Sequence, residues 1–209
     1  MRTLEQEVLK KIVKKSLFVK LINTERNEAL IEKCISKEFL DLSAVVRVVL
    51  KMDKEGMSSM ALSKKDAENL GMTEEEIYAA ALANTLRLFP PKLMNLWGYV
   101  EQNIGIGLPY EEDEVTTYIL TNQKEVDGAF YLMSRELVGN IAEMLEDDLY
   151  ILPSSVNEVL LVRASEVRDG VDGLKAMVRD VNETIVAEKE ILSYSVYHYD
   201  KEHGITIAE

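Results

Sequence analysis

The chain has 209 residues, 47% of them hydrophobic and 29% charged, which is typical of an ordinary globular protein long enough to bury a sizeable core. The formal net charge is −13, with +2 in residues 1–100 and −15 in residues 101–209, so direct binding to nucleic-acid phosphates is disfavoured. A single cysteine excludes an intrachain disulfide, and neither a signal peptide nor a run of ~20 apolar residues is visible, so we expect a soluble, cytoplasmic protein without a membrane span.

The first predicted element is an amphipathic helix over residues 4–15. Leu4, Val8 and Ile12 are four residues apart and therefore share one face of a helix. Its lysines gather in the last turns, where the negative end of the helix dipole favours them. A basic amphipathic helix can lie on a membrane or on an acidic partner, but packing against its own domain is the simpler interpretation.

The rest of the first half is predicted as strands followed by helices. The predicted strands are at residues 17–23, 42–52 and 57–62, and the last two form a hairpin. Residues 28–35 form a short element whose type stays open. Ser63 and Thr73 are predicted helix N-caps, with a glycine after the first helix and two prolines after the second. Residues 93–102 are expected to add one or two helical turns.

A loop at residues 103–114 is the predicted boundary between two α+β halves, residues 1–102 and 115–209. Two glycines and a proline interrupt it, and it ends in four consecutive acidic residues, Glu111, Glu112, Asp113 and Glu114. These four carboxylates are candidates for an acidic binding surface. No calcium-loop pattern surrounds them, so a solvated loop is the simpler interpretation. The two halves could also form one continuous domain.

The second half is organised around two short apolar runs at residues 149–152 and 159–162. Both are rich in aliphatic residues, and residues 153–157 (PSSVN) separate them, so we expect two core strands of one sheet joined by a turn. The other predicted strands are at residues 115–121, 128–132, 195–199 and 204–208, with helices at 134–146 and 169–182. Hairpins mixed with helices predict the α+β class, with a largely antiparallel sheet or sheets packed by several helices.

Three segments resemble a family of unknown function that is abundant in anaerobic gut bacteria. They are NEAL…FLDLSAVVRVV at residues 27–49, LYILPSSVNEVLLV at 149–162 and MVRDVNET…LSYSVYHYD at 177–200. The order of elements around Pro-Ser-Ser also resembles, more distantly, the uncharacterised YtpQ-like family. The resemblance spans about residues 16–203 and implies a fold rather than an activity. Such proteins often have a histidine where this chain has Asn157, which weakens a catalytic interpretation of that position.

The candidate binding residues are those of the segment between the two core strands: Pro153, Ser154, Ser155, Asn157 and Glu158. A nucleophilic serine needs a base within hydrogen-bond reach, and no nucleophile-elbow pattern surrounds these two serines. Hydroxyl groups that satisfy the backbone of a turn are the simpler interpretation. We therefore predict no catalytic residue here.

The two histidines, His198 and His203, stand near Asp200 and Glu202 in the predicted C-terminal hairpin. Zinc binds imidazole and carboxylate groups, but this spacing is not a metal-binding signature, and an exposed hairpin is the simpler interpretation. The chain also has no Walker A, HExxH or CxxC motif. The sequence thus predicts no metal and no cofactor.

The lack of a catalytic constellation favours a non-enzymatic protein-binding or regulatory module. The partner is unknown, and the negative charge of residues 101–209 favours a basic protein. One alternative is an acidic inhibitor or nucleic-acid mimic that binds a basic, nuclease-type partner. A second alternative is a small hydrolase or metal-dependent enzyme, which would bring Ser154, Ser155, Glu158 or His198 together in one pocket. The oligomeric state stays open.

Overall fold

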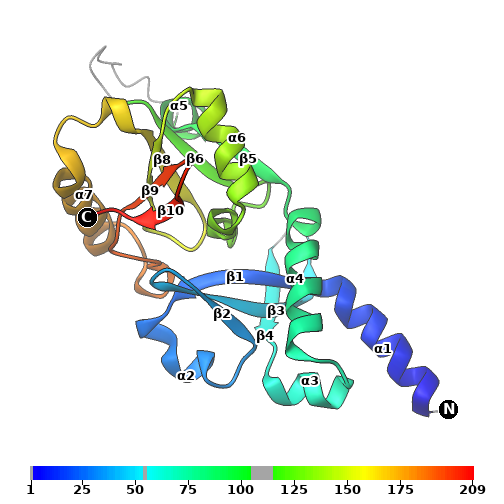
Figure 1. The fold of residues 1–209 in the computed structure, drawn as a ribbon. Coiled ribbons are helices and arrows are strands. Elements are labelled where there is room, and N and C mark those ends of the chain that lie inside the picture. The colour runs from blue at the N-terminus through cyan, green and yellow to red at the C-terminus, as the bar shows by residue number, and fades with distance from the viewer. Residues whose placement is uncertain (1, 54–55, 105–114) are drawn as a thin grey trace. The chain divides into compact units, whose positions relative to one another are not determined.

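The computed structural model describes residues 2–53, 56–104 and 115–209, with the side chains of Arg2 to Leu4, Gln6 and Ile104 left out of the description. The chain divides into two compact units, one ending at Pro90 and the other beginning at Pro91. Both combine helices with an antiparallel sheet, so the predicted α+β class is confirmed (Figure 1). The predicted acidic residues at 111–114 lie outside the described residues.

The first unit has a sheet of four strands among the described residues. Its elements are α1 (Arg2–Ser16), β1 (Leu17–Asn23), η1 (Glu25–Asn27), α2 (Glu28–Ile31), β2 (Ser36–Phe39), β3 (Leu42–Met52), β4 (Met57–Ala61), α3 (Lys64–Leu70) and α4 (Glu74–Leu88). The long strand β3 pairs with β1 along one edge and with β2 and β4 along the other. The predicted N-terminal helix and the β3–β4 hairpin are thus confirmed.

Helix α4 is fastened to β1 by a buried threonine. Thr85 donates its hydroxyl hydrogen to the Ala81 carbonyl at 2.7 Å and accepts from the Val19 backbone N–H at 2.9 Å. Phe18 and Phe89 pack edge to face beside this contact, with ring centroids 5.2 Å apart. The helix therefore satisfies a strand donor while its apolar side covers the sheet.

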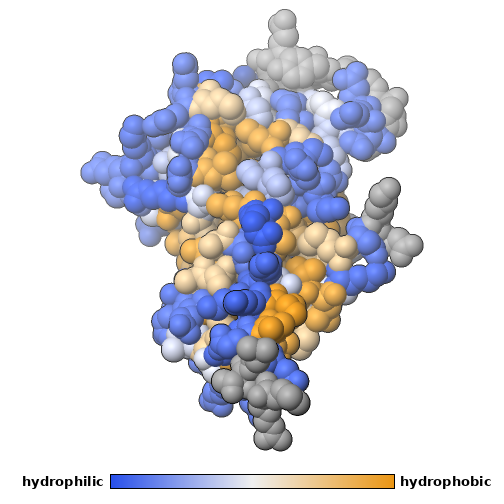
Figure 2. All heavy atoms as spheres, turned by 90° about the vertical axis from the view of Figure 1, so that its right-hand side faces the viewer, coloured by the Kyte–Doolittle hydropathy of each residue, from blue (hydrophilic) through white to orange (hydrophobic). Residues whose placement is uncertain are grey.

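Apolar side chains also remain on the outside of the first unit. Val8 and Ile12 of α1 are 52% and 59% exposed, and Leu82 and Leu86 of α4 are exposed as well. Figure 2 shows apolar areas between hydrophilic ones on the surface turned to the viewer. Helix α1 contacts α3, α4 and β3, yet Val8 and Ile12 on its apolar side stay exposed to solvent.

The second unit has a sheet of six strands among the described residues, in the order β10-β9-β7-β8-β6-β5. Its elements are β5 (Pro91–Asn95), α5 (Leu96–Ile104), β6 (Thr117–Asn122), η2 (Gly128–Met133), α6 (Arg135–Leu145), β7 (Leu149–Leu152), β8 (Val159–Arg163), η3 (Ala164–Glu166), α7 (Gly170–Thr184), η4 (Glu188–Glu190), β9 (Tyr197–Asp200) and β10 (Gly204–Ile207). The two predicted core strands are neighbours, and the predicted closing hairpin is present.

Helices cover both faces of this sheet. On one face, Leu174 and Val178 of α7 pack against Leu152 and Val162. Alternation along the strands turns Tyr199 to the opposite face, where it meets α6 at Gly139. Helix α5 contacts β5 and β6 at the other end of the sheet. Among the helices of the described ranges, none combines the length and apolar character needed to cross a bilayer.

Two predicted elements differ from the structure. Gly128–Leu132 was predicted as a strand but lies in the buried 3₁₀ helix η2, because the N–H groups of Gly128 and Ala129 donate to Asn157 and Val156 rather than to a strand partner. Residues 93–102 were predicted as helical turns, but their first part is strand β5, paired with β6. In both places, hydrogen bonds to residues distant in the chain override the local preference.

Candidate functional site

The segment between β7 and β8 is an inner part of the second unit and is held from two sides. Residues 153–156 make three backbone hydrogen bonds of 2.9 to 3.0 Å to residues 190–193. Ser155 and Ile191 also form an isolated antiparallel bridge. The join between the two strands is therefore a buried, hydrogen-bonded segment rather than a surface turn.

Asn157 fixes the other side of this segment. Its side-chain oxygen accepts from the Asp127 N–H at 3.2 Å, and its backbone carbonyl accepts from the Gly128 N–H at 3.0 Å and the Thr121 hydroxyl at 2.7 Å. These three bonds tie the segment to β6 and to the start of η2. The neighbouring Glu158 is thus carried by a rigid backbone.

The two predicted serines are buried. Ser154 is 7% and Ser155 is 4% exposed. The Ser155 hydroxyl accepts from the Asn157 N–H at 3.0 Å and also forms a hydrogen bond with the Glu158 carboxylate. Ser155 therefore does what turn chemistry predicts, satisfying a backbone donor, and in addition supports the carboxylate beside it.

Glu158 lies on the wall of a pocket of about 350 Å³ beneath α5. Met94, Ile119 and Leu160 form one row across the sheet, because Ile119 lies opposite both of the others. The pocket is lined by that row together with Leu96, Tyr99, Val100, Thr121, Glu125 and Glu158. It is therefore an apolar cavity with two carboxylates, and every lining residue belongs to the second unit.

The two carboxylates of the pocket have different surroundings. Burial raises the pKa of Glu158, and the nearby charges of Glu190 and Glu125 raise it further, while the Ser155 hydrogen bond acts in the opposite direction. Glu125, by contrast, forms an ion pair with Lys92 at 2.9 Å and lies 3.4 Å from the Tyr99 hydroxyl. Glu158 is the carboxylate that a bound cation would stabilise most.

The remaining predicted residues lie away from this pocket. The His198 ring lies against the Tyr150 ring, tilted by 57° with centroids 5.1 Å apart. Both His198 and His203 approach Asp200 through Nδ1, at 3.8 and 3.0 Å. In the part of the chain that the structure describes, no cluster of three or more His, Cys, Asp or Glu side chains could hold a metal ion.

Sequence reasoning missed Tyr99, Thr121 and Glu125. None of the three was a candidate site residue in the sequence, and Tyr99 lies in residues 93–102, which were predicted only as helical turns. Their common feature is the strand pairing of β5 with β6, which brings Lys92 opposite Thr121 and α5 over the sheet. The local spacing of apolar residues does not signal this pairing. Residues 93–102, which include part of β5, were therefore predicted as helical turns.

Comparison with known proteins gives a family but no characterised relative. No curated protein and no solved structure matches the chain. Residues 4–201 match a family of unknown function, DUF5688. The predicted membership in such a family is confirmed, while the association with gut anaerobes and the likeness to the YtpQ-like family stay predictions. Because the match covers both units, the chain belongs to the DUF5688 family.

Proposed function

We propose that the second unit is a non-enzymatic binding module that takes the ammonium group of a basic partner protein into the pocket beneath α5. The observation that carries this proposal is the partly buried Glu158 carboxylate, whose pKa is raised, in a pocket with mostly apolar walls. A carboxylate in such surroundings is stabilised by a nearby cation. A lysine side chain supplies both the cation and an aliphatic stem for the walls.

The choice of ligand follows from the two carboxylates. Lys92 and Tyr99 already contact Glu125, so Glu158 is the acceptor for an incoming ammonium. A volume of about 350 Å³ is at the lower end for ligand pockets and suits one side chain better than a large cofactor. The charge of −15 in residues 101–209 would also attract a basic protein.

The test uses Trp97, the single tryptophan of the chain, which follows the pocket-lining Leu96 in α5. Its fluorescence is followed while hexylamine, hexanol, hexanoate or a short lysine-containing peptide is added. We expect hexylamine and the peptide to bind, and hexanol and hexanoate to bind much more weakly. Affinity for the amine should rise as the pH increases above 4.5, the ordinary pKa of glutamate. The reason is that the pKa of Glu158 is raised above this value, so its carboxylate ionises in that range.

Glu158→Gln is the decisive variant. Losing the charged acceptor should weaken hexylamine binding about tenfold, whereas Glu183→Gln on α7, with the same change in net charge, should have no effect. Equal binding of hexylamine and hexanol, or equal effects of the two variants, would contradict the proposal. Turnover of an ester substrate that depends on Ser155 or Glu158 would favour the hydrolase alternative instead.

The acidic-inhibitor alternative rests on the charge of residues 101–209. It predicts inhibition of a basic nuclease that weakens with salt and does not depend on Glu158. Assaying such a nuclease with the wild-type protein and with Glu158→Gln separates the two functions, because only the pocket proposal requires Glu158.

A further inference from the structure

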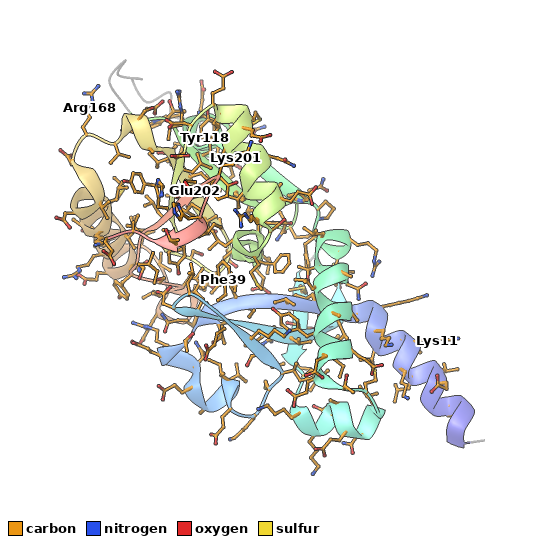
Figure 3. All side chains as sticks on the ribbon, in the orientation of Figure 1. Lys11, Phe39, Tyr118, Arg168, Lys201 and Glu202 are labelled. Carbon is orange, nitrogen blue, oxygen red and sulfur yellow. The ribbon has the colours of Figure 1, made fainter. Side chains whose placement is uncertain are left out.

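Helix α1 has a face that its own unit does not cover. Val8 and Ile12 are both more than half exposed. Glu5 and Lys15, about one turn before and one turn after them, are exposed as well. The spacing of three, four and three residues places these four positions along one side of the helix. They define the outer face of α1, and Lys11, which Figure 3 labels, lies at its edge.

The opposite side of α1 holds the helix to its unit. Val13 and Lys10, which point away from the outer face, are partly buried. At the C-terminal end of the helix, the Lys15 carbonyl accepts a hydrogen bond of 2.9 Å from the Arg87 guanidinium of α4. The outer face is therefore presented by a helix that is fixed to α4.

The charges of α1 are divided between its two halves. Glu5 and Glu7 come before Val8, and the four lysines come after it, at positions 10, 11, 14 and 15. Glu7 forms an ion pair with Lys10 at 3.3 Å within the helix. Neither Glu5 nor Lys15 forms a side-chain ion pair with any residue that the structure describes. The outer face thus has a free carboxylate at one end, two aliphatic side chains in the middle and a free ammonium at the other end.

We infer that the outer face binds the α1 of a second copy of this chain, antiparallel, around a twofold axis near Lys10. In this register Val8 packs against the partner's Ile12, because both positions are two residues from the axis. Glu5 lies opposite the partner's Lys15, because both are five residues from the axis. The twofold symmetry makes each of these contacts occur twice.

The charge pattern favours this arrangement over two others. A parallel pair of helices would place Glu5 opposite a second Glu5 and Lys15 opposite a second Lys15, and like charges repel. An anionic bilayer would attract the lysines, but it would also receive the Glu5 carboxylate on the inserting face. Only the antiparallel pair satisfies both ends of the outer face.

The contact is short, so the dimer should be weak. A helix of fifteen residues is about 22 Å long, and a pair of such helices buries less than the roughly 1,200 Å² of a stable interface. We expect sedimentation velocity of the full-length protein to show a reversible monomer–dimer equilibrium between micromolar and millimolar concentration. A monomer at every concentration in this range would overturn the inference.

Charge reversal tests the register. Glu5→Lys or Lys15→Glu alone should weaken dimerisation about tenfold, because both symmetric contacts become repulsive. An equimolar mixture of the two variants should dimerise as the wild type does, since opposite charges meet again between unlike copies. The chain with both substitutions should do the same. Failure of both to recover would contradict the antiparallel arrangement.

Lys11→Gln separates the dimer from a bilayer. In the antiparallel pair Lys11 lies beside the partner's Lys11 near the axis, so this variant should strengthen dimerisation. On vesicles of phosphatidylserine and phosphatidylcholine the loss of a lysine would weaken binding instead. Vesicle binding that weakens in Lys11→Gln, from a chain that does not self-associate, would assign the outer face to a bilayer and overturn the inference.

The apolar part of the face has a matched control. Val8→Ser combined with Ile12→Ser should abolish dimerisation and leave the fold intact, because both side chains are exposed in the single chain. Met144→Ser combined with Met177→Ser removes two exposed apolar side chains of the second unit and should leave dimerisation unchanged. A dimer that survives the first pair of substitutions would contradict the inference. Glu158→Gln should not affect self-association, since the outer face belongs to the first unit and does not depend on the proposed function.

Discussion

Glu158 is a residue at which the proposed binding of a cation and the stability of the fold oppose each other. Its pKa is raised in the folded chain, so the folded state holds the proton more tightly than the unfolded chain does. Stability therefore falls as the pH rises from the ordinary value of 4.5 through the raised value, and the ionised carboxylate is a cost at neutral pH. The groups that face it are Glu125 with its partner Lys92, Glu190, and the Ser155 hydroxyl.

We accordingly expect Glu158→Gln to stabilise the second unit at pH 7, by less than about 1 kcal/mol because the side chain is partly solvated. The fall in stability between pH 4.5 and the raised pKa should be absent from the variant, so the difference in stability between variant and wild type should grow over this pH range. Urea denaturation at several pH values measures both effects. A variant less stable than wild type at pH 7 would show that Glu158 serves the fold instead.

Gly128 is a residue at which the backbone of η2 lies directly against Thr121 and the candidate binding segment. A Cβ there would lie 2.9 Å from the Thr121 Cα and closer still to the Asn157 carbonyl oxygen. Gly128→Ala should cost roughly 1–3 kcal/mol or more, because these backbone atoms cannot move independently. Gly98→Ala in α5 is the control, since nothing lies within 4 Å of its added Cβ, and it should be neutral or slightly stabilising. Equal denaturation midpoints for the two variants would contradict this.

At the scale of single elements, the clearest agreement between sequence and structure is at the helix caps. Ser63 and Thr73 accept from the N–H groups of Asp66 and Glu76, both at 3.1 Å, and the side chains of Asp66 and Glu76 bond back to the cap backbone. Each hydroxyl satisfies a donor at a helix start that has no intrahelical partner.

Ser63→Ala and Thr73→Ala should each cost about 1 kcal/mol of stability. Thermal or chemical denaturation of the full chain measures the loss. Ser58→Ala, at an exposed position of β4, provides the comparison and should lie within ~0.5 kcal/mol of wild type. If a cap variant is no less stable than Ser58→Ala, the capping hydrogen bond contributes nothing measurable.

Such caps could be predicted because their signal is local: the capping residue and its partner are three positions apart. The hairpins of β3 with β4 and of β9 with β10 could be predicted for the same reason. The type of η2 and of β5 could not, since Asn157 and β6 decide them from a distance. The candidate site was predicted in part. Glu158 belongs to the segment between the two core strands that the sequence singles out. Glu125 and Tyr99 line the same pocket only because strands distant in the chain pair with each other.

At the scale of the whole chain, we propose that residues 1–90 fold without the rest. Every strand pairing of the first sheet, and the helix that covers it, come from within that range. The isolated polypeptide should therefore show a cooperative denaturation transition and a dispersed amide spectrum.

A polypeptide of residues 1–62 is the control, because it keeps all four strands but lacks α4 and with it the Thr85 contact to β1. We expect it to stay unfolded or to aggregate, since one face of the sheet has lost its cover. Cooperative folding of the shorter piece, or a disordered longer one, would contradict this division of the chain.

The strand order of the second sheet has a consequence for synthesis on the ribosome. Strands β5 and β6 emerge early, but β6 joins the sheet through β8, and the middle of the sheet is built from β7, β8 and β9. Until residue 163 has left the exit tunnel, the β5–β6 pair has no partner for its open edge, and Ile119 and Leu120 lack their cover. The interval between the synthesis of β6 and the synthesis of β8 is therefore the time in which the nascent chain has the most apolar surface for a chaperone to protect.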